Sequence, residues 1–137
     1  MDLQPYHRAH AFVRIEQPPE LWGVDCPERS FLRLLGELIV AGLARGSELG
    51  ELLLNVSNVV VEEDTPGSAP PRGRFVALTI SGRGDWSPEL VWAPDGSGPR
   101  GAIGPDLDGA ARDAGVPYVY VRAGTDAGSV TAYLRAA

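Results

Sequence analysis

The most regular hydrophobic pattern in the chain lies between positions 27 and 45. Apolar and small side chains recur there at spacings of three and four residues, at Phe31, Leu34, Leu35, Leu38, Ile39, Gly42 and Leu43. This period is typical of one face of an α-helix. Pro27 suits the first helical position, and Glu28 complements the helix dipole in the first turn. The pattern predicts a helix over 27–45, with Gly46 as its C-terminal stop.

Alternating apolar and polar positions predict strands on both sides of this helix. Positions 9–17 alternate weakly before two prolines and predict a first strand. Positions 47–56 fit both a helical and a strand period. The β-branched run 59–61 favours a strand over about 52–62. Positions 75–81 alternate clearly, so the two strands are expected to form an antiparallel hairpin with a long connection.

The second half of the chain repeats this mixture. Leu90, Val91 and Trp92 predict a short third strand, and apolar residues from Leu107 to Ala114 predict a short helix that ends at Gly115. Two final strands are expected at 118–122 and 129–135. The predicted order is β-α-β-β-(β)-α-β-β. We expect a single α+β domain over residues 1–137, with one antiparallel or mixed β-sheet covered by two helices.

Two segments rich in glycine and proline interrupt these elements. Positions 62–73 and 93–104 hold many of the chain's 17 glycines and 12 prolines. Such long connections are often functional, because loops shape contact surfaces. Both segments are therefore expected to be exposed loops.

Composition narrows the range of functions. The formal net charge is −6 and every one of the 12 basic residues is arginine. A negative net charge argues against sequence-independent binding to nucleic acid or to an anionic membrane surface. The absence of lysine excludes a Schiff-base lysine and a P-loop lysine. The apolar stretch 31–44 is shorter than the roughly 20 residues of a membrane span and indicates a buried helix.

Cys26 is the only cysteine, so no intrachain disulfide is possible. The N-terminus shows no secretory signal pattern, which predicts a cytoplasmic protein. Cys26 precedes the predicted helix, where the helix dipole favours a thiolate. With His7 or His10 nearby it would form a nucleophile–base pair; the alternative is a small, partly buried structural residue.

Four residues around the end of the strand at 75–81 are candidates for a ligand or partner site. They are Arg83, Asp85, Trp86 and Trp92. Aromatic side chains in loops beside a sheet line small-molecule pockets and partner interfaces. The tryptophans equally suit the edge of an ordinary core. We predict no catalytic set. We also predict no metal site, because His7 and His10 would point to opposite faces of a strand.

Positions 36–46, with the sequence GELIVAGLARG, resemble the adenine-side helix of histidine-kinase-type ATPases, including bacterial anti-sigma-factor kinases. In that family a glutamate, here Glu37, is followed four residues later by an asparagine that helps hold magnesium. Ala41 occupies this asparagine position, and the aspartate that reads adenine would fall near Gly82. The resemblance implies a degenerate relative that does not hydrolyse ATP and keeps the scaffold for protein contacts.

The sequence favours a small cytoplasmic, non-catalytic binding or regulatory protein that acts through protein–protein contacts. No cofactor is expected, and the partner is another chain or a second copy of this one. The alternative is a small-molecule-binding protein or an enzyme with a pocket between the helix at 27–45 and the sheet. A further alternative is the degenerate ATPase-like domain.

Overall fold

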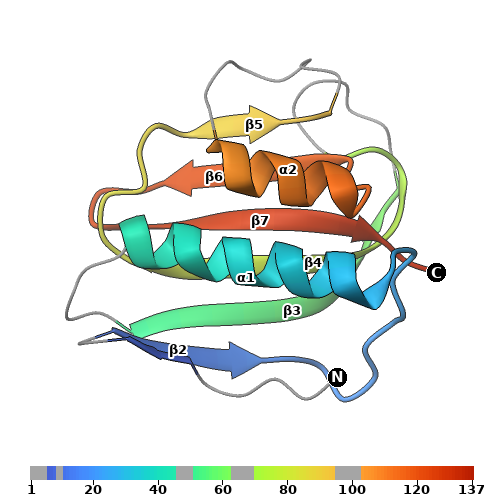
Figure 1. Ribbon diagram of the computed structural model, residues 1–137, viewed down its shortest axis with the longest axis horizontal. Helices are drawn as coiled ribbons and strands as arrows, with labels where there is room; N and C mark the ends of the chain where they lie inside the picture. The colour runs from blue at the N-terminus through green and yellow to red at the C-terminus, as the bar shows by residue number, and fades with distance from the viewer. Residues whose placement is uncertain (1–5, 9–10, 46–50, 63–69, 95–102) are drawn as a thin grey trace.

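The computed structural model describes residues 6–8, 11–45, 51–62, 70–94 and 103–137. These residues form seven strands and two helices, in the order β1 (Tyr6–Arg8), β2 (Ala11–Glu16), α1 (Glu28–Arg45), β3 (Glu51–Val61), β4 (Gly73–Arg83), β5 (Leu90–Trp92), α2 (Pro105–Asp113), β6 (Tyr118–Ala123) and β7 (Ala127–Arg135). The strands join in one sheet, and both helices lie on the same face of it (Figure 1). The predicted α+β fold with one sheet and two helices is confirmed.

The strand order across the sheet is β1-β2-β3-β4-β7-β6-β5. Only β2 and β3 run parallel, because α1 connects them; all other neighbours are antiparallel, so the sheet is mixed. β1 was not predicted, since three residues carry too little pattern to identify a strand. The chain returns from β6 through β7 to the centre of the sheet, where β7 pairs with β4.

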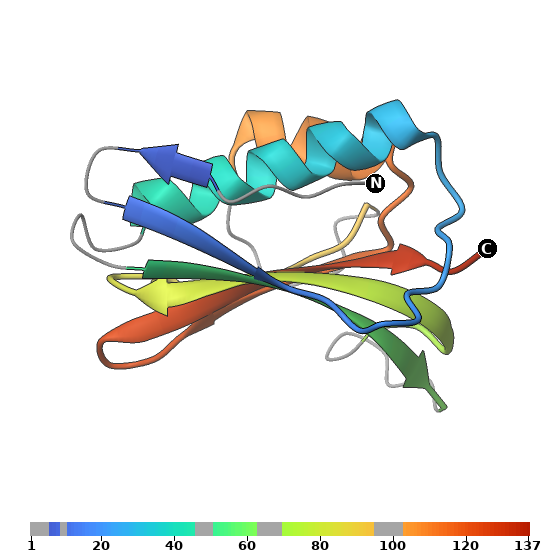
Figure 2. The ribbon, with the colours of Figure 1, turned by 90° about the horizontal axis from the view of Figure 1, so that it is seen from below.

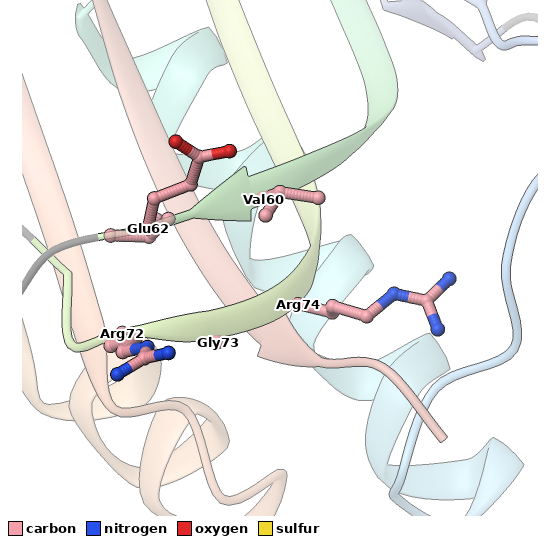
Figure 3. A pocket seen from close by; sticks show the side chains of 6 residues that line it. Val60, Glu62, Arg72, Gly73 and Arg74 are labelled. Carbon is pink, nitrogen blue, oxygen red and sulfur yellow. The ribbon is translucent and has the colours of Figure 1, made fainter.

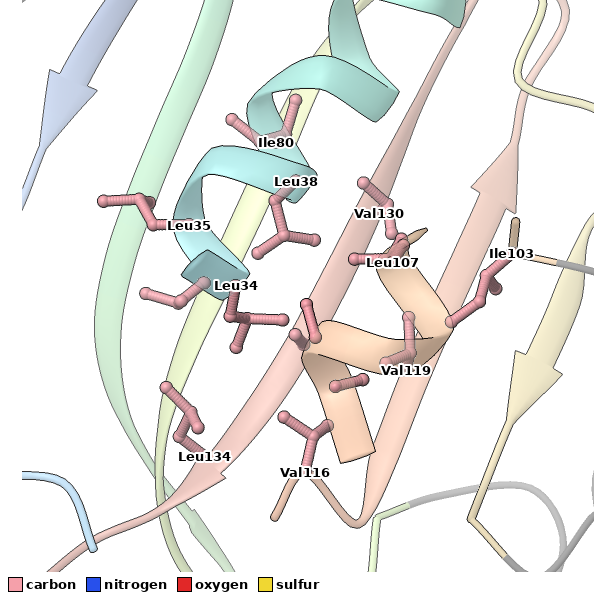
Figure 4. Packing of buried hydrophobic residues seen from close by; sticks show 14 of the residues in the cluster. Leu34, Leu35, Leu38, Ile80, Ile103, Leu107, Val116, Val119, Val130 and Leu134 are labelled. Carbon is pink, nitrogen blue, oxygen red and sulfur yellow. The ribbon is translucent and has the colours of Figure 1, made fainter. Parts of the chain in front are cut away.

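α1 confirms the predicted helix and its buried face. Leu34 and Leu38 are fully buried, and they point from the helix into the space above the sheet (Figure 4). Gly46, the predicted stop, lies outside the described residues. The three- and four-residue spacing forms the inner side of α1 because 3.6 residues complete one helical turn.

The ambiguous segment 47–56 is a strand wherever the structure describes it. β3 alternates, with Leu52, Leu54 and Val56 buried towards the helices. β3 and β4 form the predicted antiparallel hairpin, in which Val56 lies opposite Leu78. Residues 63–69 of the predicted loop lie outside the described residues.

The second half also follows the predicted order. α2 begins with a proline in its first turn, and Gly115, with φ +70°, follows its end. A left-handed residue at this position favours glycine. The strands predicted at 90–92, 118–122 and 129–135 are β5, β6 and β7. Residues 95–102 of the second predicted loop lie outside the described residues.

The sheet has two different faces. Figure 2 shows α1 and α2 together on one side of it. On the other side no described helix lies, and a row of short polar side chains crosses the central strands, including Asn55, Thr79 and Thr131. The hydroxyl oxygens of Thr79 and Thr131 are 2.9 Å apart and share a hydrogen bond. Short polar groups suit a part of a sheet face that contacts water. Phe75 and Ala77 of β4, which lie on the same face, are buried.

Candidate functional site

The four predicted site residues occupy two separate places. Arg83 ends β4 opposite Ala127, and it is exposed, as is Asp85. Trp86 is fully buried, and its indole nitrogen donates to the carbonyl oxygen of Gly82 at 3.0 Å. Trp86 is therefore part of the core at this end of the sheet.

Trp92 lies elsewhere, on the edge strand β5. Trp92 pairs with Val119 of β6. β5 is the third strand from β4 across the sheet, and Trp92 also lies about 17 Å from Arg83 when measured along the strand direction. Its indole nitrogen donates to a carboxylate oxygen of Asp108 at 2.7 Å. The guanidinium of Arg112 lies 5.4 Å from the centre of the Trp92 ring. The four residues consequently do not converge on one ligand.

Core side chains fill the space between α1 and the sheet. Leu34, Leu38, Leu54, Leu78 and Ile80 all have an exposed fraction of 0%. Figure 4 shows the side chains of Leu34 and Leu38 on α1 and of Ile80 on β4 close together in this space. A ligand bound between α1 and the sheet would have to displace this packing, which is costly because protein cores are densely packed.

One shallow pocket lies at the end of the β3–β4 hairpin, and another lies at the C-terminal end of α2. The first has a volume of about 420 Å³ and is lined by Val60, Val61, Glu62, Arg72, Gly73 and Arg74 (Figure 3). The guanidinium of Arg74 stacks 4.0 Å from the centre of the Trp22 ring. The second, of about 440 Å³, is lined by Pro94, Arg112, Gly115, Val116, Pro117 and Arg135. Neither lining contains a nucleophilic side chain or a histidine.

Cys26 is partly buried just before α1. Desolvation raises the pKa of its thiol, and the negative charges of Asp25 and Asp113 raise it further. The structure therefore opposes the thiolate that the helix dipole was expected to favour. Of the histidines that were considered as its base, His7 lies in β1 and His10 lies outside the described residues.

Two of the positions that resemble an ATPase motif, Ala41 and Gly82, carry no polar side chain where the family has an asparagine and an aspartate. Glu37 is half-buried on α1, and Ala41, one turn later, has no side-chain donor or acceptor. At Gly82 an added Cβ atom would lie 2.8 Å from a methyl carbon of Leu52 and 3.2 Å from the carbonyl oxygen of Glu51. A carboxylate that reads adenine therefore has no room at position 82.

An exposed apolar line runs along the outside of α1. It consists of Leu32, Gly36, Val40 and Ala44, which we call the outer α1 surface. The four-residue spacing places these residues above one another on the helix. Leu32 is 45% exposed and Val40 is 53% exposed. The helix was expected to be buried, but the structure buries only its inner side.

Sequence reasoning missed this surface although a signal was present. Positions 36–44 contain a single charged residue, Glu37, so this half of α1 is apolar on nearly all sides. A helix that is apolar all round is normally buried. In the described part of the chain, no element lies over the outside of α1 (Figures 1 and 2). The outer α1 surface is thus the described feature that best fits a contact site.

Comparisons with known proteins leave the site to be interpreted from its own geometry. No protein-family model matches this chain, and no curated protein matches it either. Among the described residues, neither helix is long and apolar enough to cross a membrane. The same residues contain no group of three or more histidine, cysteine, aspartate or glutamate side chains placed to hold a metal ion.

Proposed function

We propose that this protein is a non-catalytic binding protein with a regulatory or accessory role, and that it acts by contacting another polypeptide through the outer α1 surface. The observation that carries this proposal is the exposure of Leu32 and Val40 on α1, whose residues 36–44 contain a single charged side chain. Burying exposed apolar area contributes about 25 cal/mol per Å², so a polypeptide that covers this line gains affinity.

The surroundings of the outer α1 surface support a protein partner. The line is convex and follows one helix, which suits another helix or strand better than a small molecule, because small ligands bind in concave pockets. A negative net charge supports a partner other than nucleic acid. A single cysteine supports a cytoplasmic location, where disulfides are rare.

Site-specific photocrosslinking in the native host tests the proposal. A photoreactive phenylalanine analogue replaces Val40 in one variant and Val60 in a control, because Val60 is 55% exposed but belongs to β3. We expect a polypeptide adduct from position 40 and little or none from position 60. Equal adducts from both positions, or none from position 40, would contradict a contact site on α1.

A further inference from the structure

Gly36 stands in the middle of α1, where packing within the described chain does not require a glycine. A Cβ atom added there would meet no heavy atom within 4 Å. Glycine inside a helix lowers helix stability relative to alanine. Gly42 is different, because a Cβ atom there would lie 2.4 Å from Cγ2 of Ile80. Gly36 therefore weakens α1 without a packing reason in the described part of the molecule.

We propose that a second copy of this chain covers the outer α1 surface, with the two α1 helices antiparallel and crossing at Gly36. This inference rests on the proposed function, because it names the polypeptide that the surface binds. A glycine at the crossing point allows two helix backbones to approach closely. The missing side chain of Gly36 thus has a role in the contact between two copies.

The outer α1 surface is self-complementary around this glycine. Leu32 and Val40 lie four residues before and after Gly36. In an antiparallel pair related by a two-fold axis through Gly36, Leu32 of one copy therefore meets Val40 of the other. Each large apolar side chain that is exposed on α1 is covered in this arrangement.

Charges beside the surface select the antiparallel direction. Arg33 and Glu37 lie on the same flank of α1, and a two-fold axis brings these flanks of two antiparallel helices together. Arg33 of one copy then faces Glu37 of the other, offset by about 3 Å along the helix axis. A parallel pair would instead place these flanks of the two copies on opposite sides of the contact, so Arg33 of one copy would not face Glu37 of the other.

Both charged side chains are available for this pairing. The guanidinium of Arg33 lies 4.0 Å from the carboxylate of Asp113, and the two side chains are 51% and 50% exposed. This contact is long and solvated, so it competes only weakly with a second partner. Glu37 has no ion pair with another described residue. The second copy supplies the cation that Glu37 lacks within the described chain.

Light scattering after size-exclusion chromatography tests association. The purified chain is expected to reach twice its monomer mass of 14.5 kDa at high concentration. Val40→Glu should raise the dimer dissociation constant at least tenfold, whereas Val60→Glu, an equally exposed valine on β3, should leave it unchanged. A monomer at all concentrations, or a dimer that resists Val40→Glu, overturns the inference.

Disulfide trapping tests the direction of the helices. In a Cys26→Ser background, Leu32→Cys and Val40→Cys chains are oxidised alone and as an equal mixture. In the antiparallel pair, two Leu32 positions are about 12 Å apart along the helix axis, too far for a disulfide. The mixture should therefore give mixed dimers much faster than either variant alone gives its own dimer. Fast trapping of each variant alone indicates a parallel pair and overturns the proposal.

The outcomes separate this inference from the proposed function. A monomeric protein whose position 40 still crosslinks to a different polypeptide contradicts the second copy but supports the contact site. A protein that neither associates nor crosslinks contradicts both.

Discussion

Gly42 lies directly against Ile80, and a Cβ atom at position 42 would come within 2.4 Å of Cγ2 of that side chain. Since Gly42 is on α1 and Ile80 is on β4, this contact marks a place where helix and sheet approach closely. A second nearby atom, Cδ1 of Leu52, would lie 3.3 Å from the same Cβ. The inner side of α1 is thus fitted to the sheet by the absence of a side chain.

The two glycines of α1 should respond in opposite ways to alanine. Gly36→Ala should raise the free energy of unfolding by about 0.5–1 kcal/mol, because alanine is the better helix former. Gly42→Ala should lower it by about 1–3 kcal/mol, because the added methyl group overpacks the core against Ile80. Urea unfolding in a Val40→Glu background measures both effects with self-association suppressed. Stabilisation by Gly42→Ala would contradict the contact.

Leu38 should be among the most costly residues to truncate. Its side chain is fully buried between α1 and the sheet. Leu38→Ala should lower the free energy of unfolding by about 2–5 kcal/mol through lost burial and the cavity left behind. Leu32→Ala in the Val40→Glu background is the matched control, and it should change the value by only about 0.5 kcal/mol. Equal effects of the two substitutions would show that the inner face is wrongly assigned.

Asp108 should contribute stability that depends on pH. Hydrogen bonds from Arg112 and then from Trp92 lower the pKa of its carboxyl group in the folded protein. Stability from this carboxylate is therefore present above the unfolded pKa, and it is lost as pH falls through the folded pKa. Because the carboxylate is partly exposed, Asp108→Ala should cost only about 1 kcal/mol at pH 7.

Thermal or urea unfolding between pH 7 and pH 3 measures the effect of Asp108. The difference between the parent chain and Asp108→Ala should shrink as the pH falls. Asp108→Asn keeps an oxygen acceptor for the Trp92 indole but removes the charge, so it should retain part of the stability at pH 7. A difference that is constant with pH would contradict the role of the carboxylate.

Cys26 should behave as an unreactive structural thiol. Because its pKa is raised by desolvation and by Asp25 and Asp113, iodoacetamide should label the folded protein at pH 7 more slowly than it labels free cysteine. Cys26→Ser should change stability little and leave self-association intact. Rapid labelling at pH 6, far below the pKa of about 8.5 of a free thiol, would instead support a nucleophilic cysteine.

Sequence alone was sufficient for the elements whose pattern is local. The helix at 27–45 and the strands of the two hairpins followed from periodicity, because 3.6- and two-residue periods are properties of neighbouring positions. The order of helices and strands, and the α+β class, followed from those elements. β1 was not predicted, because Tyr6–Arg8 is too short to show a period.

Only the tertiary structure decided which elements that are distant in sequence meet. The pairing of β4 with β7, and the parallel pairing of β2 with β3, depend on contacts between distant parts of the chain. The same is true of the site residues. Trp86 and Trp92 are close in sequence, yet the chain leaves the central strand β4 before Trp86 and carries Trp92 to the edge strand β5.

The outer α1 surface shows most clearly what the sequence determines and what the tertiary structure decides. The sequence specifies that Leu34 and Leu38 share a face of the helix with each other, and that Leu32, Gly36 and Val40 share another. Periodicity relates positions within one helix, but it carries no information about what packs on each side. The sheet covers the first face of α1. The second face stays exposed because no further layer of the described fold packs on the outer side of the helices.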